Sequence, residues 1–262
     1  MGKSGLTEDA IIGLIARLRS SAANPLKADD IGYFRGDKRT YAATDSLIAG
    51  VHFRQNWLSP AEIAWKLFAR NWSDFLCKGI QPTGALLSLA LTRQTAHKSF
   101  VVPFLRSLDE LLTQHGITLT GGDTAHSAND VFTLAFFGTR GKFLPRANKA
   151  VRPGDLILQL GGVGGSNYAL ERLLKAGGLS PREKAFFARP QIFPHLPQAK
   201  FLKATIDQSD SVQKSLKLLA DANQTQLRID VDSILPSHQR VLSGLSAKAQ
   251  ILLAAEDLAV FA

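Results

Sequence analysis

The sequence predicts an α/β protein, with some α+β character, in which helices cover one face of a mixed sheet. Over the first 140 residues, apolar strand patterns alternate with amphipathic helical patterns, which is typical of layered domains of this class. With 262 residues, 45% of them hydrophobic, the chain can bury a sizeable core in one large or two modest domains. A stretch rich in Arg, Lys and Pro, Lys142–Pro153, indicates a boundary. We therefore expect an N-terminal domain over 1–140 and a C-terminal α/β domain over 141–262.

Each element of the first half has a local signal. Apolar residues at helical spacing predict a helix over 6–19, and a strand over 39–44 places Asp45 at its end. Ser59 and Pro60 are a suitable cap and first residue for a helix over 61–78. Strands are expected over 86–92, 117–120 and 131–139, with a helix over 98–115.

The second half is predicted to continue with strands over 155–160, 226–231 and 250–253. Helices are expected over 166–175, after Pro181, and up to Ala222. The glycine-rich turn GGVGGSN lies between a strand and a helix, where backbone N–H groups can cradle phosphate. No GK[ST] sequence follows it, so a structural turn is favoured.

Composition narrows the class of partner. The net charge is +9 and the pI is near 9.8, but Lys and Arg are spread along the chain, so nucleic acid is not expected. A basic surface that offsets an acidic, metal-loaded cleft is the simpler interpretation. The single Cys77 cannot form an internal disulfide, and no apolar stretch is long enough to span a membrane. Glu8 and Asp9 are unlike a signal peptide, so we expect a cytosolic (cytoplasmic) protein.

The strongest functional signal is a set of aspartates that stand singly among small residues. Magnesium prefers oxygen ligands and usually takes only one or two carboxylates per ion when phosphates share it. Small neighbours let a triphosphate approach the backbone. These aspartates are Asp30, Asp45, Asp74, Asp123, Asp207 and Asp210. Together they predict a site for several Mg²⁺ ions that hold phosphates.

Asp74 carries a further signal, because an acid in the last turn of a helix opposes the helix dipole. A bound metal ion would offset this effect, and a solvated acid is the alternative.

Seven segments resemble, in order, the motifs of one family. They are KADDIGYF, ATDSLIAGVHF, WKLFARNWSDFLCKGIQP, HGITLTGGDTAHS, PRANKAVRPGDLILQLGGVGGS, IDQSDSV and AAEDLAVF. The family counterparts are GDDAAV, TTDxLVEGVHF, WKALAVNLSDLAAMGAxP, VGGDT, RSGAKPGDxIxVTGxLGxS, IDxSDGL and GEDYELLF. The chain thus resembles the thiamine-monophosphate kinase family, of the superfamily that includes aminoimidazole ribonucleotide synthetase and selenophosphate synthetase.

The resemblance implies a kinase that uses ATP as co-substrate and several Mg²⁺ ions to convert thiamine phosphate to thiamine diphosphate. It also implies a homodimer whose strands pack across the interface. The implied metal ligands are Asp30, Thr44, Asp45, Asp74, Asp123, Asp207 and Asp210. The implied ATP contacts are Gly121, Gly122, Asp123, Arg146 and Ser209, and the thiamine contacts are His52 and Glu256. Catalysis would depend on Asp45, Asp123, Asp210 and Arg146.

This chemistry needs no paired nucleophile and base, because the acceptor is already an anionic phosphate oxygen. Accordingly, the histidines have no convincing Ser–His–Asp partners.

Some positions depart from the family motifs. Ser211 replaces the glycine of IDxSDGL, where a side chain would resist a positive φ. The family's chain usually continues for several dozen residues beyond the position of Ala262, including an aromatic residue that lies against thiamine. Two alternatives follow, namely a related kinase with another acceptor and a catalytically weak nucleotide-binding scaffold.

Overall fold

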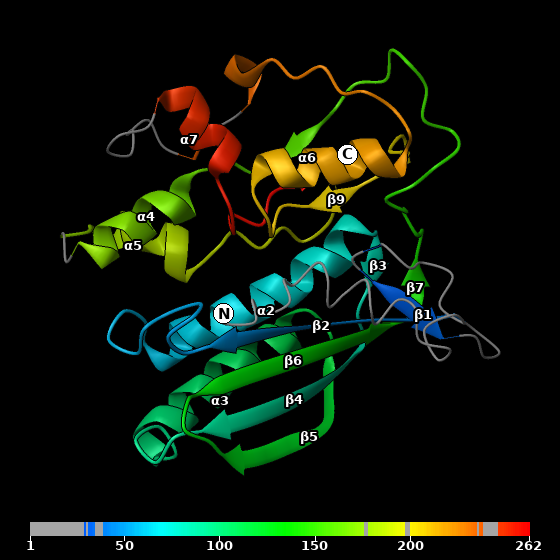
Figure 1. Cartoon of the computed structure of the whole chain (residues 1–262). Helices are drawn as coiled ribbons and strands as arrows, with labels where there is room; N and C mark the ends of the chain where they lie inside the picture. The colour runs from blue at the N-terminus through cyan, green and yellow to red at the C-terminus, as the bar shows by residue number, and fades with distance from the viewer. Residues whose placement is uncertain are drawn as a thin grey trace, which may run out of the picture.

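The computed structural model describes residues 29, 31–34, 39–175, 178–196, 200–234, 236–237 and 246–262 (Figure 1). Its strands are β1 (Gly32–Phe34), β2 (Thr40–Ile48), β3 (Ile80–Gln81), β4 (Gly84–Leu91), β5 (Thr118–His126), β6 (Val131–Gly138), β7 (Arg140–Gly141), β8 (Gln159–Leu160), β9 (Ile206–Asp207) and β10 (Val260–Phe261). Its helices are α2 (Pro60–Cys77), α3 (Lys98–Gln114), α4 (Gly165–Leu174), α5 (Pro181–Ala188), α6 (Val212–Ala222), α7 (Ala247–Leu253) and the short 3-10 helix η2 (Val231–Ser233). The helix expected over 6–19 and the predicted ligand Asp30 lie outside these ranges.

The main sheet has the strand order β1-β2-β6-β4-β5, and β4 and β5 are its parallel pair among antiparallel neighbours. This confirms the predicted mixed sheet. Helices α2 and α3 cover one of its faces (Figure 1). The side chains of β6 alternate accordingly, with Phe132, Leu134 and Phe136 fully buried toward the helices. Helix α2 also contacts β9, β10 and α5 from the second half of the chain. It is therefore the element that joins the two halves.

Helix α2 begins where the sequence predicts. Ser59 and Glu62 form a reciprocal capping box at its N-terminus. Its apolar side is aromatic, and Phe68 stacks on Trp72 with ring centroids 5.7 Å apart. Phe75 packs edge-on against Phe136 of β6. The aromatic stripe is therefore part of the core. The polar side of α2 faces the other segments that pack against this helix.

The second half is built around a small sheet with the order β8-β10-β9. Helix α6 packs on it through Val212 and Leu216, which share a buried cluster with Ile206 and Phe261. The strands expected over 226–231 and 250–253 are wrong. Residues 226–230 have no regular structure, and residues 250–253 belong to helix α7. This segment forms a helix because Ser246 caps the sequence AKAQILL, which is rich in helix-forming residues.

Two strands are longer than expected, and this changes where site residues lie. Strand β2 continues to Ile48, so Asp45 lies within it rather than at its end. Strand β5 runs to His126, so Gly121, Gly122 and Asp123 are paired to β4 rather than forming a turn. A register shift between Ala85 and Leu86 leaves Thr120 of β5 without a partner residue in β4.

Gly122 is required by close packing between strands. A Cβ at this position would lie 1.7 Å from the carbonyl oxygen of Leu87. We expect Gly122→Ala to lower the free energy of unfolding by about 2 kcal/mol, as overpacking does, and thermal melting would measure this. Gly84→Ala, in the neighbouring strand, is the matched control because its nearest atom would be 4.0 Å away. Equal losses in the two variants would contradict this role for Gly122.

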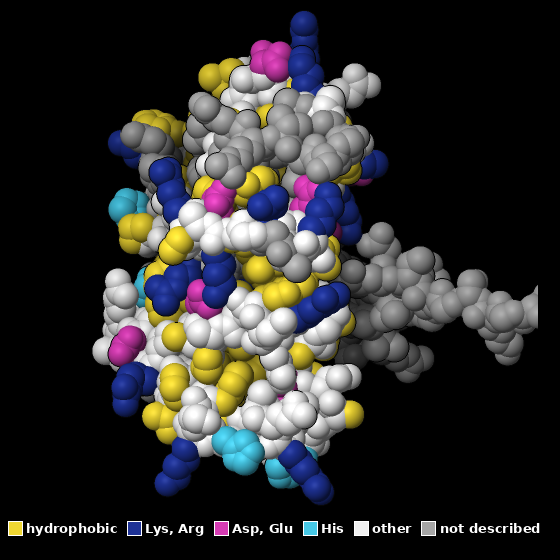
Figure 2. Space-filling view, turned by 90° about the vertical axis from the view of Figure 1, so that its left-hand side faces the viewer, with side chains coloured by type: hydrophobic (Ala, Val, Ile, Leu, Met, Phe, Trp, Pro, Cys, Tyr) yellow, Lys and Arg dark blue, Asp and Glu magenta, His cyan; other side chains and the backbone are white. Residues whose placement is uncertain are grey.

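The basic residues do not gather into one patch on the face seen in Figure 2, where Lys and Arg are scattered among apolar and uncharged side chains. Across the described ranges, the structure contains no helix of the length and apolarity that a membrane crossing requires.

Candidate active site

Two acidic and two basic side chains meet where strand β2, helix α2 and the C-terminal segment lie together. The Nη2 of Arg70 lies 3.3 Å from Oδ1 of Asp45, and its Nη1 donates to Oε1 of Glu256 at 2.7 Å. One turn earlier on α2, the Nζ of Lys66 lies 3.0 Å from Oε2 of Glu256. We call these four residues the Asp45–Glu256 cluster. It joins a strand of the first half to the C-terminal segment through α2.

Backbone geometry fixes both ends of the Asp45–Glu256 cluster. The N–H of Asp45 donates to Oδ1 of Asn71 at 3.0 Å, which ties β2 to α2 at this point. Glu256 has a φ of +56°, an uncommon conformation for a residue with a side chain. Its N–H donates to the carbonyl of Ser209 at 3.3 Å. The strain at Glu256 is tolerated where the backbone turns its carboxylate toward two cations.

Burial and the charges of its neighbours together set the pKa of each group in this cluster. The Lys66 side chain is only 1% exposed, and its Nζ lies 3.5 Å from the centroid of the Phe187 ring. Burial therefore lowers the pKa of Lys66, and Glu256 only partly restores it. Burial also raises the pKa of Asp45, against the opposing charge of Arg70. Burial raises the pKa of Glu256, but the charges of Lys66 and Arg70 together lower this pKa below its ordinary value.

His52 lies beside this cluster in a defined tautomer. Its Nδ1 accepts a hydrogen bond of 3.0 Å from the N–H of Ile48, so the ring proton of the neutral form is on Nε2. Burial lowers the pKa of His52, and the charge of Arg70 adds to this effect. His52 is therefore neutral at pH 7 and offers an N–H donor on its Nε2 side.

We expect the pKa of His52 in the folded protein to lie below 6.5. When the pKa of a histidine is lower in the folded than in the unfolded chain, the unfolded chain is protonated at a higher pH than the folded one. The stability that His52 contributes is therefore fully present above pH 6.5, and it is lost as the pH falls through the folded pKa. The chemical shift of its Cε1–H during an NMR pH titration measures this, with His52→Gln to assign the peak. A pKa at or above 6.5 would contradict the described environment.

The C-terminal half of α2 holds a second group of predicted site residues. The hydroxyl of Ser73 donates to Oδ2 of Asp207 at 2.9 Å, and Asp74 follows it on the helix, half-buried. Just beyond the helix, the buried Nζ of Lys78 lies 2.8 Å from Oδ1 of Asp29. The other oxygen of Asp29 accepts from the N–H of Arg146 at 3.0 Å. Residues of the first loop, β9 and the 142–153 segment thus meet at α2.

Within one protomer, other predicted site residues do not lie with the Ser73 and Asp207 group. Thr44 is next to Asp45 in a strand, so the two side chains point to opposite faces, and the Thr44 hydroxyl donates to the carbonyl of Leu134. Asp210 pairs with Lys214 at 3.0 Å on the exposed start of α6. Within the described residues, no three His, Cys, Asp or Glu side chains form a group that could hold a metal ion.

Asp123 lies on the far edge of the sheet. Asp45 is in one cross-sheet row with Leu134, Leu87 and Gly122, so three strand spacings, about 14 Å, separate β2 from β5. All nine residues of β5 are exposed. Asp123 and Asp45 of the same chain therefore cannot share one ion.

Comparisons with known proteins identify the family of the chain. The family "AIR synthase related protein, N-terminal domain" matches residues 28–139. Thiamine-monophosphate kinase of Leptospira interrogans is 32% identical over 242 residues, which cover 89% of this chain and 76% of that protein. The chain belongs to the thiamine-monophosphate kinase family. The enzyme of that name from Corynebacterium glutamicum is 28% identical over 93% of this chain and 78% of its own length.

Solved structures show the same fold. The structure of AaThiL complexed with AMPPCP and TMP has a TM-score of 0.83 at 22% identity, covering 97% of this chain and 84% of that one. Thiamine monophosphate kinase from Aquifex aeolicus has a TM-score of 0.77 at 21% identity, covering 98% and 88%. At these identities the likeness establishes the fold.

The structure explains one departure from the thiamine-monophosphate kinase motifs and the role of one glycine-rich turn. Ser211 has a φ of −62°, so the strain expected from a non-glycine residue is absent, and its hydroxyl caps α6 by accepting from the N–H of Lys214. The turn GGVGGSN is structural, as the sequence favours. Asp257 accepts hydrogen bonds from the N–H groups of Gly164 and Ser166 at 2.7 and 2.9 Å. These backbone donors are thus already occupied at the start of α4.

The sequence patterns did not indicate Lys66, Arg70 or Asp257 as site residues. Burial raises the pKa of Asp257 to about 6, although the backbone hydrogen bonds oppose this shift. The signal for Arg70 was present in the sequence, because the family motif WKALAVNLSD has valine where this chain has WKLFARNWSD. Alignment of the two motifs therefore shows a cation, Arg70, where the family motif has an apolar residue. A cation next to a predicted metal ligand indicates a residue that acts in the site.

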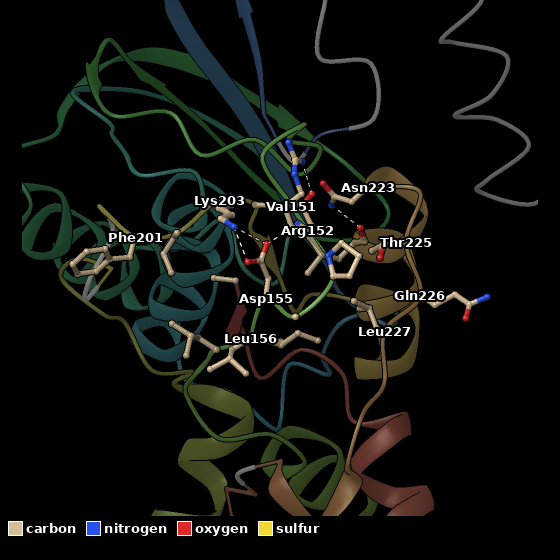
Figure 3. Close-up of a pocket in the computed structure, with 18 residues that line it drawn as sticks. Val151, Arg152, Asp155, Leu156, Phe201, Lys203, Asn223, Thr225, Gln226 and Leu227 are labelled. Carbon is tan, nitrogen blue, oxygen red and sulfur yellow. Dashed lines mark hydrogen bonds and ion pairs between the residues drawn. The ribbon is translucent and has the colours of Figure 1, made fainter.

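A cavity of about 440 Å³ lies in the second half of the chain. In Figure 3 its wall includes Leu156, Phe201 and Leu227, and the dashed lines mark the ion pair between Asp155 and Lys203. None of the predicted site residues lines it. We therefore place the candidate active site at α2 and not at this cavity.

Proposed function

We propose that this protein transfers the γ-phosphoryl group of ATP to thiamine phosphate and forms thiamine diphosphate, with Mg²⁺ as the metal. One observation carries the proposal. Residues of family motifs that are far apart in sequence, among them Asp45, Asp207 and Glu256, all meet along helix α2. The named relatives and the neighbour complexed with AMPPCP and TMP support ATP and thiamine phosphate as the two substrates. Residues 1–140 would form the metal- and ATP-binding domain and residues 141–262 the C-terminal domain.

The donor set suits magnesium in its chemistry. The candidate ligands are carboxylates and one hydroxyl, the hard oxygen donors that this ion prefers. They are Asp30, Thr44, Asp45, Asp74, Asp123, Asp207 and Asp210. Because Mg²⁺ on a polyphosphate needs only one or two carboxylates per ion, these residues can act singly, without a three-carboxylate cage. Bound ions would neutralise the phosphates and stabilise the charge that develops during transfer.

The chain's own residues position the two anionic substrates. Arg146, whose backbone is fixed by Asp29, would contact ATP together with Gly121, Gly122 and Ser209. His52 and Glu256 would hold thiamine phosphate, with Nε2–H of His52 as a neutral donor. No general base is needed, since the accepting phosphate oxygen is already ionised. The protein's contribution is therefore orientation and charge balance.

We further propose that the site is completed in a homodimer. Strand β5 has a free edge that carries Asp123, and within the described residues β1 pairs with only Thr40–Ala42 of β2. Among the described residues no strand pairs with this edge of β2 beyond Ala42, and the N–H of Asp45 is held there by the Asn71 side chain, which a partner strand would have to displace or leave in place. Leu86 and Leu119, on β4 and β5, are also exposed, as expected of a surface that a partner covers. Pairing of β5 with the β2 edge of a second copy would place Asp123 of one protomer near Asp45 of the other.

Mixed dimers test this arrangement. Asp45→Asn and Asp123→Asn chains should each be inactive alone, whereas each mixed dimer would contain one intact site. Random mixing after mild dissociation should restore about a quarter of wild-type activity, because half of the dimers are mixed and each has one good site of two. Size-exclusion chromatography with light scattering confirms that the sample dissociates to monomers before mixing and returns to dimers afterwards. Failure to recover activity in mixed dimers would contradict the shared site.

An acceptor panel tests the function itself. ADP release is measured with ATP, Mg²⁺ and thiamine phosphate, unphosphorylated thiamine, or no acceptor. We expect release only with thiamine phosphate. Release with unphosphorylated thiamine but not with thiamine phosphate would identify a related kinase that uses another acceptor. Nucleotide binding without release would favour the scaffold, for which the Arg70–Asp45 ion pair is the specific supporting observation.

A further inference from the structure

Asp45, a proposed metal ligand, already has a cation of the chain against it. The Nη2 of Arg70 is 3.3 Å from Oδ1 of Asp45, and the Arg70 side chain is 12% exposed. The same guanidinium is held from its other side by Glu256 at 2.7 Å. The position of the guanidinium therefore does not depend on Asp45 alone, because Glu256 also holds it.

The charges of the Asp45–Glu256 cluster are balanced without a metal. Two carboxylates, Asp45 and Glu256, face two cations, Lys66 and Arg70. A divalent cation placed on Asp45 would approach the guanidinium closely, and like charges at such distances repel strongly in a partly buried site. The ion can bind Asp45 only as the guanidinium withdraws toward Glu256.

A second position of the same helix region repeats the pattern. Lys78 is fully buried and its Nζ lies 2.8 Å from Asp29, the neighbour of the predicted ligand Asp30. In the motif that this stretch resembles, WKALAVNLSDLAAMGAxP, the residues matching Arg70 and Lys78 are valine and methionine. In both places a cation of this chain stands beside an acid of the predicted metal-binding region, where the motif has an apolar residue.

We propose that Arg70 is a built-in counter-ion of Asp45 that competes with the divalent cation for this carboxylate, so that Arg70 sets the metal affinity of the site. This inference rests on the proposed function only in taking Asp45 as a metal ligand. Arg70 acts through Asp45 and is therefore a positioning residue. In the metal-free protein it stabilises the cluster, and in the metal-bound protein its guanidinium is released from Asp45.

Binding of Mn²⁺ alone to the full-length chain, followed by the EPR signal of the free ion, tests the competition. We expect Arg70→Val and Arg70→Gln to bind Mn²⁺ about tenfold more tightly than wild type, as is typical of coupled sites. Arg70→Lys, which keeps the charge, should stay close to wild type. Arg106→Val, in the middle of α3, removes the same charge at an exposed position and is the matched control.

Melting temperatures provide the second measurement. Without metal, Arg70→Gln should melt below wild type, and saturating Mn²⁺ should narrow this difference. A purely packing role for Arg70 would leave the difference unchanged by metal, and that result would overturn the proposal.

The Asp45→Asn substitution separates this inference from the proposed function. We expect it to abolish the tightening that Arg70→Gln causes. If Asp45→Asn weakens Mn²⁺ binding but the Arg70 variants bind like wild type, the role of Arg70 is refuted and the proposed metal site stands. If Asp45→Asn leaves Mn²⁺ binding unchanged in every background, both are refuted.

Discussion

Replacing Glu256 with alanine is expected to lower the free energy of unfolding by about 3 kcal/mol, because it leaves two cations without their shared carboxylate. The reason lies chiefly with Lys66, which is 1% exposed and cannot recover its ion pair from solvent. Arg70 would keep only Asp45. Chemical denaturation followed by tryptophan fluorescence measures the loss.

Two variants calibrate this result. Glu110→Ala removes the same side chain from an exposed position of α3 and should change stability little. The double variant Glu256→Ala with Lys66→Met should be more stable than Glu256→Ala alone, since a buried charge without a partner is removed. A loss below about 0.5 kcal/mol for Glu256→Ala, the range of ordinary surface changes, would show that the cluster does not hold the two halves together.

Asp45→Asn is expected to lower kcat by at least about 100-fold, the magnitude typical for loss of one electrostatic contact to a transition state. Asparagine keeps the shape of the side chain but not its charge, so a metal ion loses a ligand while the fold is retained. Steady-state kinetics with ATP and thiamine phosphate give the value, and melting curves show that the variant is folded.

Asp109→Asn, an exposed position on α3, is the matched control for this substitution and should retain wild-type kcat. A change confined to KM for ATP, with kcat unchanged, would mean that Asp45 contributes only to uniform binding of the nucleotide.

The layered fold could be predicted because its signals are local. The capping residue Ser59, the aromatic stripe of α2 and the alternation in β6 each act within a few residues. The segment 250–253 misled the sequence analysis, because a short apolar run fits a strand as well as a helix, and the Ser246 cap decides between them.

The candidate site was predictable in composition but not in arrangement. Aspartates in small-residue settings can be recognised from sequence, whereas contacts such as Ser73 with Asp207 depend on tertiary packing. The lengths of β2 and β5 determine where Asp45 and Asp123 lie. Because β5 continues past Gly122, Asp123 lies in the edge strand of the described sheet and not in a loop near Asp45.

The most direct test of the central claim is transfer of labelled phosphate. The purified chain is incubated with ATP labelled at the γ-phosphate, Mg²⁺ and thiamine phosphate, and the products are separated chromatographically. We predict labelled thiamine diphosphate, formed in proportion to ADP and absent with Asp45→Asn. Hydrolysis of ATP without labelled thiamine diphosphate, or no turnover by a folded protein that binds Mg²⁺ and ATP, would contradict the claim.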